Sequence, residues 1–134
     1  MASLFVYGTL MDPDVAQAVI GRTQQQLNVE PASLDGYCAL LVAGAPYPGL
    51  RKAPGETVRG MLLTGLTETE MHRLDEYEDL TVYRQEEIAV RDSAGYEVMA
   101  IIYMPTQRLR LTRTPWDLAR WRRRSKAGYM ARLS

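Results

Sequence analysis

The chain has 134 residues and a formal net charge of zero, a length that fits one domain with a core of its own. Its 46% hydrophobic and 24% charged residues are typical of an ordinary globular protein, and no apolar run approaches the about 20 residues that a membrane span needs. The single cysteine, Cys38, excludes an intramolecular disulfide and, with His72 as the one histidine, leaves too few ligands for a zinc site, so we expect no metal and a reducing, cytoplasmic compartment.

The N-terminal residues predict a strand followed by a helix. Residues 3–8 (SLFVYG) are apolar and barely alternate, which favours a central strand, and the start of the chain lacks the basic region of a secretory signal. After a loop, Asp12 is expected to cap a helix that has Pro13 at its first position and stops at Gly21.

The next part of the chain predicts two strands and a loop. The strands are expected near residues 25–31 and 36–43, joined by a turn at residues 34–36. Residues 44–56 contain three prolines and three glycines, a density that predicts a loop without regular structure.

A strand at residues 57–66 is expected to lead into a second helix. Thr67 and Glu70 have the spacing of a capping box, so this helix should begin at Glu68. Residues 83–92 and 96–105 predict a β-hairpin across DSAG.

The C-terminal segment predicts a last helix. Thr114 and Pro115 repeat the cap-plus-proline pattern, and the helix would hold WDLARWRRR and lead into a basic end. Altogether we expect about six strands and three helices without regular βαβ alternation. This pattern favours a mixed α+β fold with a largely antiparallel, curved or barrel-like sheet over a doubly wound parallel one.

The turn from Tyr7 to Leu10 is the first candidate binding site. It lies where a strand ends and a helix approaches, and Gly8 leaves backbone N–H groups uncovered. Free N–H groups in such a place bind carboxylate or phosphate. A tight turn that simply needs glycine is the alternative interpretation.

The second candidate is the acidic stretch RLDEYEDLTVYR. Helical spacing places Glu78 on the apolar side, where desolvation and neighbouring carboxylates would raise its pKa toward the range that a general acid or base needs. The alternative is a solvated helix end in which Glu78 or Asp79 pairs with Arg84. We favour that alternative for Asp75, Glu76 and Asp79, and leave it open for Glu78.

Several tyrosines lie near these candidates in the sequence. Alternation should turn Tyr83 and Arg84 to opposite sides of a strand, and one of them could border the pocket of Glu78. Tyr47, in the rigid loop YPGL, could form a wall of a small-molecule site or cap the core. Tyr103 is equally ambiguous, and Cys38 is interpreted as a packing residue.

These motifs together resemble those of the gamma-glutamylcyclotransferase-like family. The family pattern is an N-terminal Y-G-[ST]-L and a later L-D-x-[FY]-E followed shortly by Y-x-R, matched here by "VYGTL" and "LDEYEDLTVYR", with "YPGL" between them. The resemblance covers about residues 3–105. It divides the chain into a cyclotransferase-like domain at 1–107 and a basic helical extension at 108–134, which we expect to pack on the same domain.

The resemblance implies a cofactor-free transferase. In such proteins the α-amine of a gamma-glutamyl compound attacks the side-chain carbonyl, which releases an amine or amino acid and leaves 5-oxoproline. The glutamate of the motif implies Glu78 as general acid/base, and the Y-G-[ST]-L turn implies that Tyr7, Gly8, Thr9 and Leu10 bind the substrate, with Tyr47 and Tyr83 as further substrate-binding candidates. One departure is Asp79, where many relatives have glycine.

Two alternatives remain at this level. The protein could bind a small acidic metabolite without turnover. The second alternative rests on residues 108–134, which carry eight Arg and one Lys against one Asp. This net charge of +8 leaves −8 on residues 1–107. RWRRR, with Trp116 and Trp121 nearby, could contact nucleic acid, but we favour arginines that lie on the acidic body of the same chain or of a homodimer partner.

Overall fold

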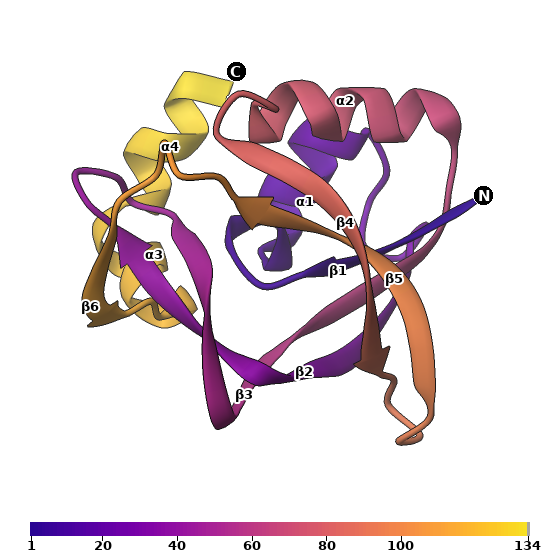
Figure 1. The fold of residues 1–134 in the computed structure, drawn as a ribbon. Helices are drawn as coiled ribbons and strands as arrows, with labels where there is room; N and C mark the ends of the chain where they lie inside the picture. The colour runs from indigo at the N-terminus through magenta and orange to yellow at the C-terminus, as the bar shows by residue number, and fades with distance from the viewer. Residues whose placement is uncertain (134) are drawn as a thin grey trace.

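The structure, a computed structural model, describes residues 1–133 and confirms a mixed α+β fold (Figure 1). The described chain contains six strands, four α-helices and one short 3-10 helix. In chain order they are β1 (Ala2–Val6), η1 (Thr9–Met11), α1 (Pro13–Ile20), β2 (Asn28–Val42), β3 (Pro48–Leu66), α2 (Glu68–Glu78), β4 (Tyr83–Arg91), β5 (Glu97–Pro105), β6 (Leu111–Pro115), α3 (Leu118–Arg124) and α4 (Lys126–Leu133). None of the helices in the described part of the chain is long and apolar enough to cross a membrane.

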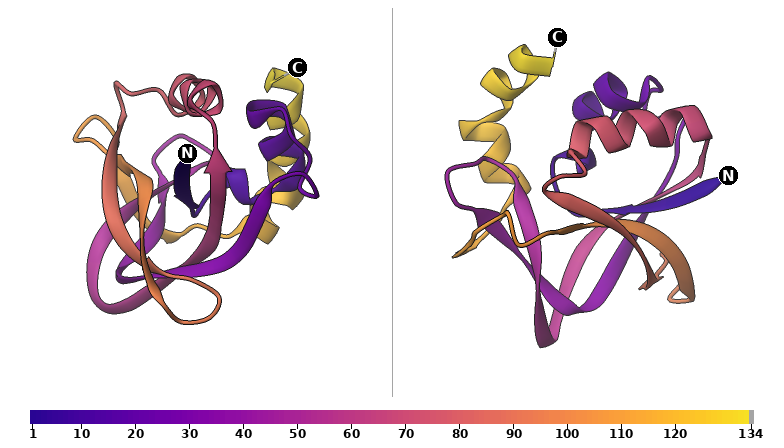
Figure 2. Two further views of the ribbon diagram at one scale, coloured as in Figure 1. Left: turned by 90° about the vertical axis from the view of Figure 1, so that its right-hand side faces the viewer. Right: turned by 45° about the horizontal axis from the view of Figure 1, so that its top comes forward.

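Five of the strands close into a barrel. β1 pairs with β3 and β5, β5 with β4, β4 with β2, and β2 with β3, which completes the ring. The β1–β5 pair is parallel, whereas the other pairs are antiparallel. β6 adds to β2 outside the ring. The expected barrel-like, largely antiparallel sheet is therefore confirmed, and its curvature is visible in both views of Figure 2.

The central strand β1 is buried on both faces, which explains why its sequence barely alternates. Phe5 belongs to a cluster inside the barrel with residues from the other four strands, such as Leu62 and Ile102. Leu4 and Val6 face the other way, into a cluster beneath α1 and α2. One strand thus joins the two cores and leads directly to the turn at residues 7–10.

The predicted loop at residues 44–56 is confirmed at residues 44–47 and wrong from Pro48 onward, where β3 begins. The predicted turn at residues 34–36 is also wrong, because β2 continues through it and pairs with β3 in one long ribbon. Asp35 pairs with Thr57 and Tyr37 pairs with Lys52, so four residues of β3 bulge opposite one residue of β2. Pro54 and Gly55 fall in this bulge, where proline needs no partner for its missing N–H and glycine can adopt its φ of 86°.

The predicted starts of the first two helices are confirmed. The Asp12 carboxylate accepts from the backbone N–H of Asp14 at 2.9 Å, and α1 ends at Gly21 with φ 92°. Thr67 and Glu70 form the capping box that begins α2. The 83–92 and 96–105 hairpin is also present, as β4 and β5.

The C-terminal segment differs from the prediction at its start. Thr114 and Pro115 belong to β6, an edge strand where proline is tolerated, and α3 is instead capped by Asp117, which accepts from the N–H of Ala119 at 2.9 Å. A further helix, α4, follows α3 in the segment for which the sequence predicts only a basic end.

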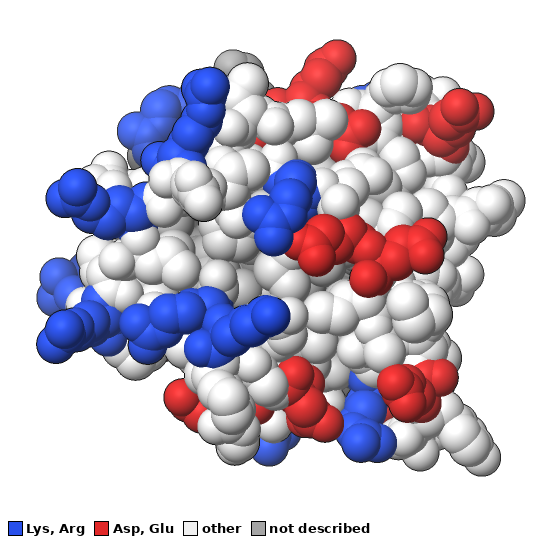
Figure 3. All heavy atoms as spheres, in the orientation of Figure 1, with Lys and Arg blue, Asp and Glu red and all other residues white. Residues whose placement is uncertain are grey.

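The basic segment lies on its own chain. Arg122 and Lys126 pair with the buried Asp12 at 2.8 and 3.0 Å, and Trp121 is buried in the core beneath the helices. On the face in Figure 3, Lys and Arg gather over the side that carries β6, α3 and α4, whereas Asp and Glu gather on the side of α2, β4 and β5. Arg122 and Lys126 therefore contact carboxylates of the same chain.

Candidate active site

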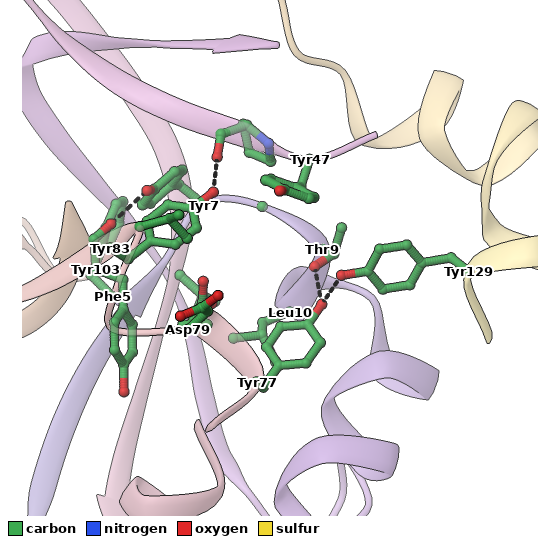
Figure 4. Close-up of a pocket in the computed structure, with 15 residues that line it drawn as sticks. Phe5, Tyr7, Thr9, Leu10, Tyr47, Tyr77, Asp79, Tyr83, Tyr103 and Tyr129 are labelled. Carbon is green, nitrogen blue, oxygen red and sulfur yellow. Dashed lines mark hydrogen bonds between the residues drawn. The ribbon is translucent and has the colours of Figure 1, made fainter. Parts of the chain in front are cut away.

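A cavity of about 200 Å³ opens between the turn after β1, the end of α2 and the helix α4 (Figure 4). The turn follows β1, which is fixed by its two cores, and α2 brings its last residues to the same place. The lining residues are Phe5, Val6, Tyr7, Gly8, Thr9, Leu10, Tyr47, Pro48, Tyr77, Glu78, Asp79, Val82, Tyr83, Tyr103 and Tyr129.

The structure brings all the site residues expected from the sequence to this one cavity. They come from four separate places in the chain, and the closure of the barrel makes them neighbours. These residues are Tyr7, Gly8, Thr9, Leu10, Tyr47, Glu78 and Tyr83. Their proximity is a structural result, whereas their roles remain predictions.

Glu78 is the last residue of α2 and is half-buried in the cavity wall. No hydrogen bond or ion pair joins its carboxylate to another of the described residues 1–133. Desolvation by the surrounding protein raises its pKa from 4.5 to about 8. An unpaired carboxyl group with this pKa can both accept and return a proton near neutral pH.

The other carboxylates of the acidic stretch have structural partners. Asp79 is exposed, has φ 64°, and accepts from the N–H and hydroxyl of Thr81 at 3.0 and 2.6 Å. These bonds lower the pKa of Asp79, and burial alone accounts for the shift of Glu78. The expected pairing of Glu78 or Asp79 with Arg84 is wrong, because Arg84 pairs with Glu86 at 2.7 Å on the solvent side of β4.

Asp75 also differs from the expected solvated helix end. Its carboxylate accepts from the hydroxyl of Tyr103 at 2.6 Å and from the side-chain amide of Gln85 at 2.5 Å. The bond to Asp75 ties α2 to β5 and fixes the Tyr103 ring at the cavity. Glu76 is exposed, as expected.

The turn at residues 7–10 leaves several backbone donors unused. The N–H groups of Gly8, Thr9 and Leu10 donate no hydrogen bond to another described residue. Gly8 has φ −128°, so the turn does not need glycine for a left-handed conformation. A Cβ at this position would lie 2.9 Å from Cγ of Pro48, so glycine is needed because the YPGL loop packs directly against the turn.

Tyrosines form most of the remaining wall. Tyr7 donates to the backbone carbonyl of Tyr103 at 2.6 Å, and Tyr83 donates to the carbonyl of Pro48 at 2.8 Å. The centroids of the Tyr47 and Tyr83 rings lie 6.3 Å apart. Burial is the main cause that raises the pKa values of Tyr7, Tyr83 and Tyr103, and the hydrogen bond to Asp75 raises that of Tyr103 further. These hydroxyls therefore stay protonated and act as donors.

The opposite wall contains two residues that the site prediction did not include. The hydroxyl of Tyr77 lies 2.6 Å from that of Thr9 and is also hydrogen-bonded to the hydroxyl of Tyr129. Tyr77 could have been found, because it precedes Glu78 in the recognised motif. Tyr129 had no such signal, because it lies in α4, outside any motif.

The cavity lining carries two acidic residues, Glu78 and Asp79, and no Lys or Arg among its described residues. Within residues 1–133, no cluster of three His, Cys, Asp or Glu residues could hold a metal ion. The polar groups of the cavity lining are therefore the carboxyls of Glu78 and Asp79, tyrosine and threonine hydroxyls, and backbone amides.

Comparison with known proteins places this geometry in a family. Residues 4–123 match the family described as "Gamma-glutamyl cyclotransferase, AIG2-like". The AIG2-like protein D of Arabidopsis thaliana is 29% identical over 133 residues, which cover 97% of this chain and 85% of the relative.

Solved structures share the fold. An Arabidopsis thaliana protein with a known solution structure has a TM-score of 0.73 at 24% identity, and the match covers 98% of this chain and 87% of that protein. A gamma-glutamyl cyclotransferase has a TM-score of 0.69 at 16% identity, and the match covers 82% of this chain and 69% of that protein. At these identities the likeness concerns the fold alone.

Proposed function

The chain belongs to the AIG2-like gamma-glutamyl cyclotransferase family, and we propose that it is a cyclotransferase that converts a gamma-glutamyl compound to 5-oxoproline and a free amine. The observation that carries the proposal is the unpaired Glu78 carboxyl, with its raised pKa, across a small cavity from the free amides of residues 8–10.

The proposed reaction is an intramolecular acyl transfer. The α-amine nitrogen of the substrate attacks its own Cδ carbonyl, forming the new N–Cδ bond of the five-membered ring. The Cδ–N bond to the leaving amine breaks. The attacking ammonium nitrogen loses two protons, one before and one after the attack, and the leaving nitrogen gains two and departs as an ammonium. Because nucleophile and carbonyl belong to one molecule, the enzyme has to fold the substrate and move these protons.

Glu78 is proposed to move these protons, one at a time. The attacking amine is an ammonium with a pKa of about 8 in water, and the pKa of the Glu78 carboxyl is also about 8. Transfer between groups of matched pKa costs little free energy in either direction. The same carboxyl can therefore accept the proton and then return it to the leaving nitrogen.

The turn at residues 7–10 is proposed to bind the α-carboxylate of the substrate. Three backbone N–H groups without partners suit an anion, and the mostly protonated Glu78 at neutral pH limits repulsion of a second carboxylate. Tyr47 and Tyr83 would then form the walls that hold the glutamyl chain in its folded form.

The test is a panel of gamma-glutamyl amines and dipeptides, with 5-oxoproline measured by mass spectrometry. Wild type should yield product from at least one member, and Glu78→Gln should lower its kcat by a factor of about 10²–10⁴. Glu76→Gln, which changes an exposed carboxylate on the same helix, is the matched control. Full activity in Glu78→Gln would contradict the role of Glu78, and no turnover by wild type would favour a protein that binds without reaction.

A further inference from the structure

Three hydroxyl groups from separate elements form a continuous chain along one wall of the cavity. Thr9 lies in η1, Tyr77 in α2 and Tyr129 in α4, and Tyr77 is hydrogen-bonded to both of the others. Three hydroxyls carry three protons, and two bonds between them use two. One proton is left over, on Thr9, Tyr77 or Tyr129 according to the direction of the two bonds, and neither Thr9 nor Tyr129 has another hydroxyl partner among the described residues.

All three hydroxyls line the cavity, so the leftover donor is available where a bound carboxylate would meet no cationic side chain. No lysine or arginine lines the described cavity, so a bound carboxylate has to be held by neutral donors alone. Thr9 belongs to the turn whose amides are unpaired. A hydroxyl chain that ends in this turn can add a donor polarised by the bonds behind it.

We propose that Tyr129, at the far end of this chain, is a substrate-positioning residue that directs the Thr9–Tyr77–Tyr129 hydroxyls toward the α-carboxylate of the ligand. The inference rests on the proposed function for the identity of the ligand. It assigns the C-terminal helix a part in the site, which the N-terminal motifs alone do not supply.

The fold holds Tyr129 in place from two sides. Its ring packs edge-on against the rings of Trp121 and Tyr77, with distances between ring centroids of 5.4 and 6.5 Å. The segment that carries it is tied to the start of α1, because Arg122 and Lys126 pair with Asp12. Asp12 directly follows η1, so the same few residues anchor both ends of the hydroxyl chain.

The test measures binding of 5-oxoproline and of its uncharged amide, 5-oxoprolinamide, by calorimetry. Tyr129→Phe keeps the ring and removes the hydroxyl. Because a hydrogen bond to a charged acceptor is worth more than one to a neutral acceptor, the Kd for 5-oxoproline should rise about tenfold or more, and the Kd for the amide by a smaller factor. Tyr96→Phe, at an exposed site in the β4–β5 turn, should change neither.

Tyr77→Phe is a second variant, in which both hydrogen bonds of the hydroxyl chain are lost. It should also raise the Kd for 5-oxoproline by a larger factor than the Kd for the amide. Three results would overturn the inference: an unchanged Kd for 5-oxoproline in Tyr129→Phe, equal losses for the acid and the amide, or no binding of 5-oxoproline to wild type. A wild type that binds 5-oxoproline but turns over no gamma-glutamyl compound would instead count against the proposed reaction, and the comparison of acid and amide would still decide the role of Tyr129.

Discussion

The hydroxyl of Tyr83 donates a 2.8 Å hydrogen bond to the backbone carbonyl of Pro48. The bond joins the first residue of β4 to the first residue of β3. Pro48 also packs against Gly8 so closely that a Cβ there would lie 2.9 Å from its Cγ. The position of the aromatic wall and the position of the turn at residues 7–10 therefore depend on each other through Pro48.

The first prediction is that Gly8→Ala lowers substrate affinity. The added methyl group has to displace Pro48, which would separate the wall from the turn and lengthen the Tyr83 bond. We expect KM to rise by about tenfold and stability to fall by about 1–3 kcal/mol. Gly128→Ala, where a Cβ meets nothing within 4 Å, is the control. An unchanged KM in Gly8→Ala would show that the turn does not need this contact.

The second prediction concerns the pH dependence of catalysis. Glu78 has to be ionised to accept a proton, so kcat/KM should rise with pH toward the folded-state pKa of about 8. It should fall again above about pH 8, because the substrate amine and Glu78 have then both lost their protons and Glu78 has no proton to give to the leaving nitrogen. The profile should be a bell centred near pH 8, and a rate that is flat from pH 6 to 8 would contradict a titrating Glu78.

Much of the fold could be predicted because local signals were strong. The caps at Asp12 and Thr67 were predicted, and so was the central position of β1. The β2–β3 ribbon was missed because Pro54 and Gly55 predict a loop when read locally. Only the partner strand reveals that they lie in a bulge, and pairing between distant segments is not visible in local sequence.

The site shows the same division between local and distant information. Helical periodicity was enough to place Glu78 on a partly buried face. It did not reveal that Asp75 binds Tyr103, which lies 28 residues away, or that Tyr129 reaches Tyr77 from 52 residues away. Those contacts depend on how the barrel closes and on where α4 packs, and no motif contains both partners.

The third prediction is that Glu78 reduces stability at alkaline pH. Its pKa is about 8 in the folded state against 4.5 for the unperturbed group, so the folded state binds more protons between these pH values. The free energy of unfolding therefore falls as pH rises through this window and levels off above pH 8.

Glu78→Gln removes this penalty. Relative to wild type, the variant should gain about 2–3 kcal/mol between pH 5 and pH 9, less than full burial would give because the cavity admits water. Denaturant unfolding at the two pH values measures the difference, and Glu76→Gln should show almost none. A gain that is equal at both pH values would mean that Glu78 does not titrate in this range.

The last prediction concerns the ion pairs that hold the C-terminal helices. Asp12 is fully buried. Burial raises its pKa, but hydrogen bonds from Arg122, Lys126 and the N–H groups of the α1 cap outweigh burial and lower the pKa overall. The stabilisation is thus present above pH 3.8, the unperturbed value, and is lost as pH falls through the lower folded-state pKa.

Replacing both cations, in Arg122→Met with Lys126→Met, leaves the buried carboxylate with its cap bonds alone. We expect a loss of about 2–3 kcal/mol and a red shift in the fluorescence of Trp121, which is 3% exposed in the folded protein, measured in a Trp116→Phe background. Arg123→Met with Arg124→Met, two exposed arginines of the same helix, is the matched control. If the ion pairs also position Tyr129, the Arg122→Met, Lys126→Met variant should bind 5-oxoproline more weakly, and the control should not. A fluorescence shift without weaker binding would show that the ion pairs anchor α3 but do not position Tyr129.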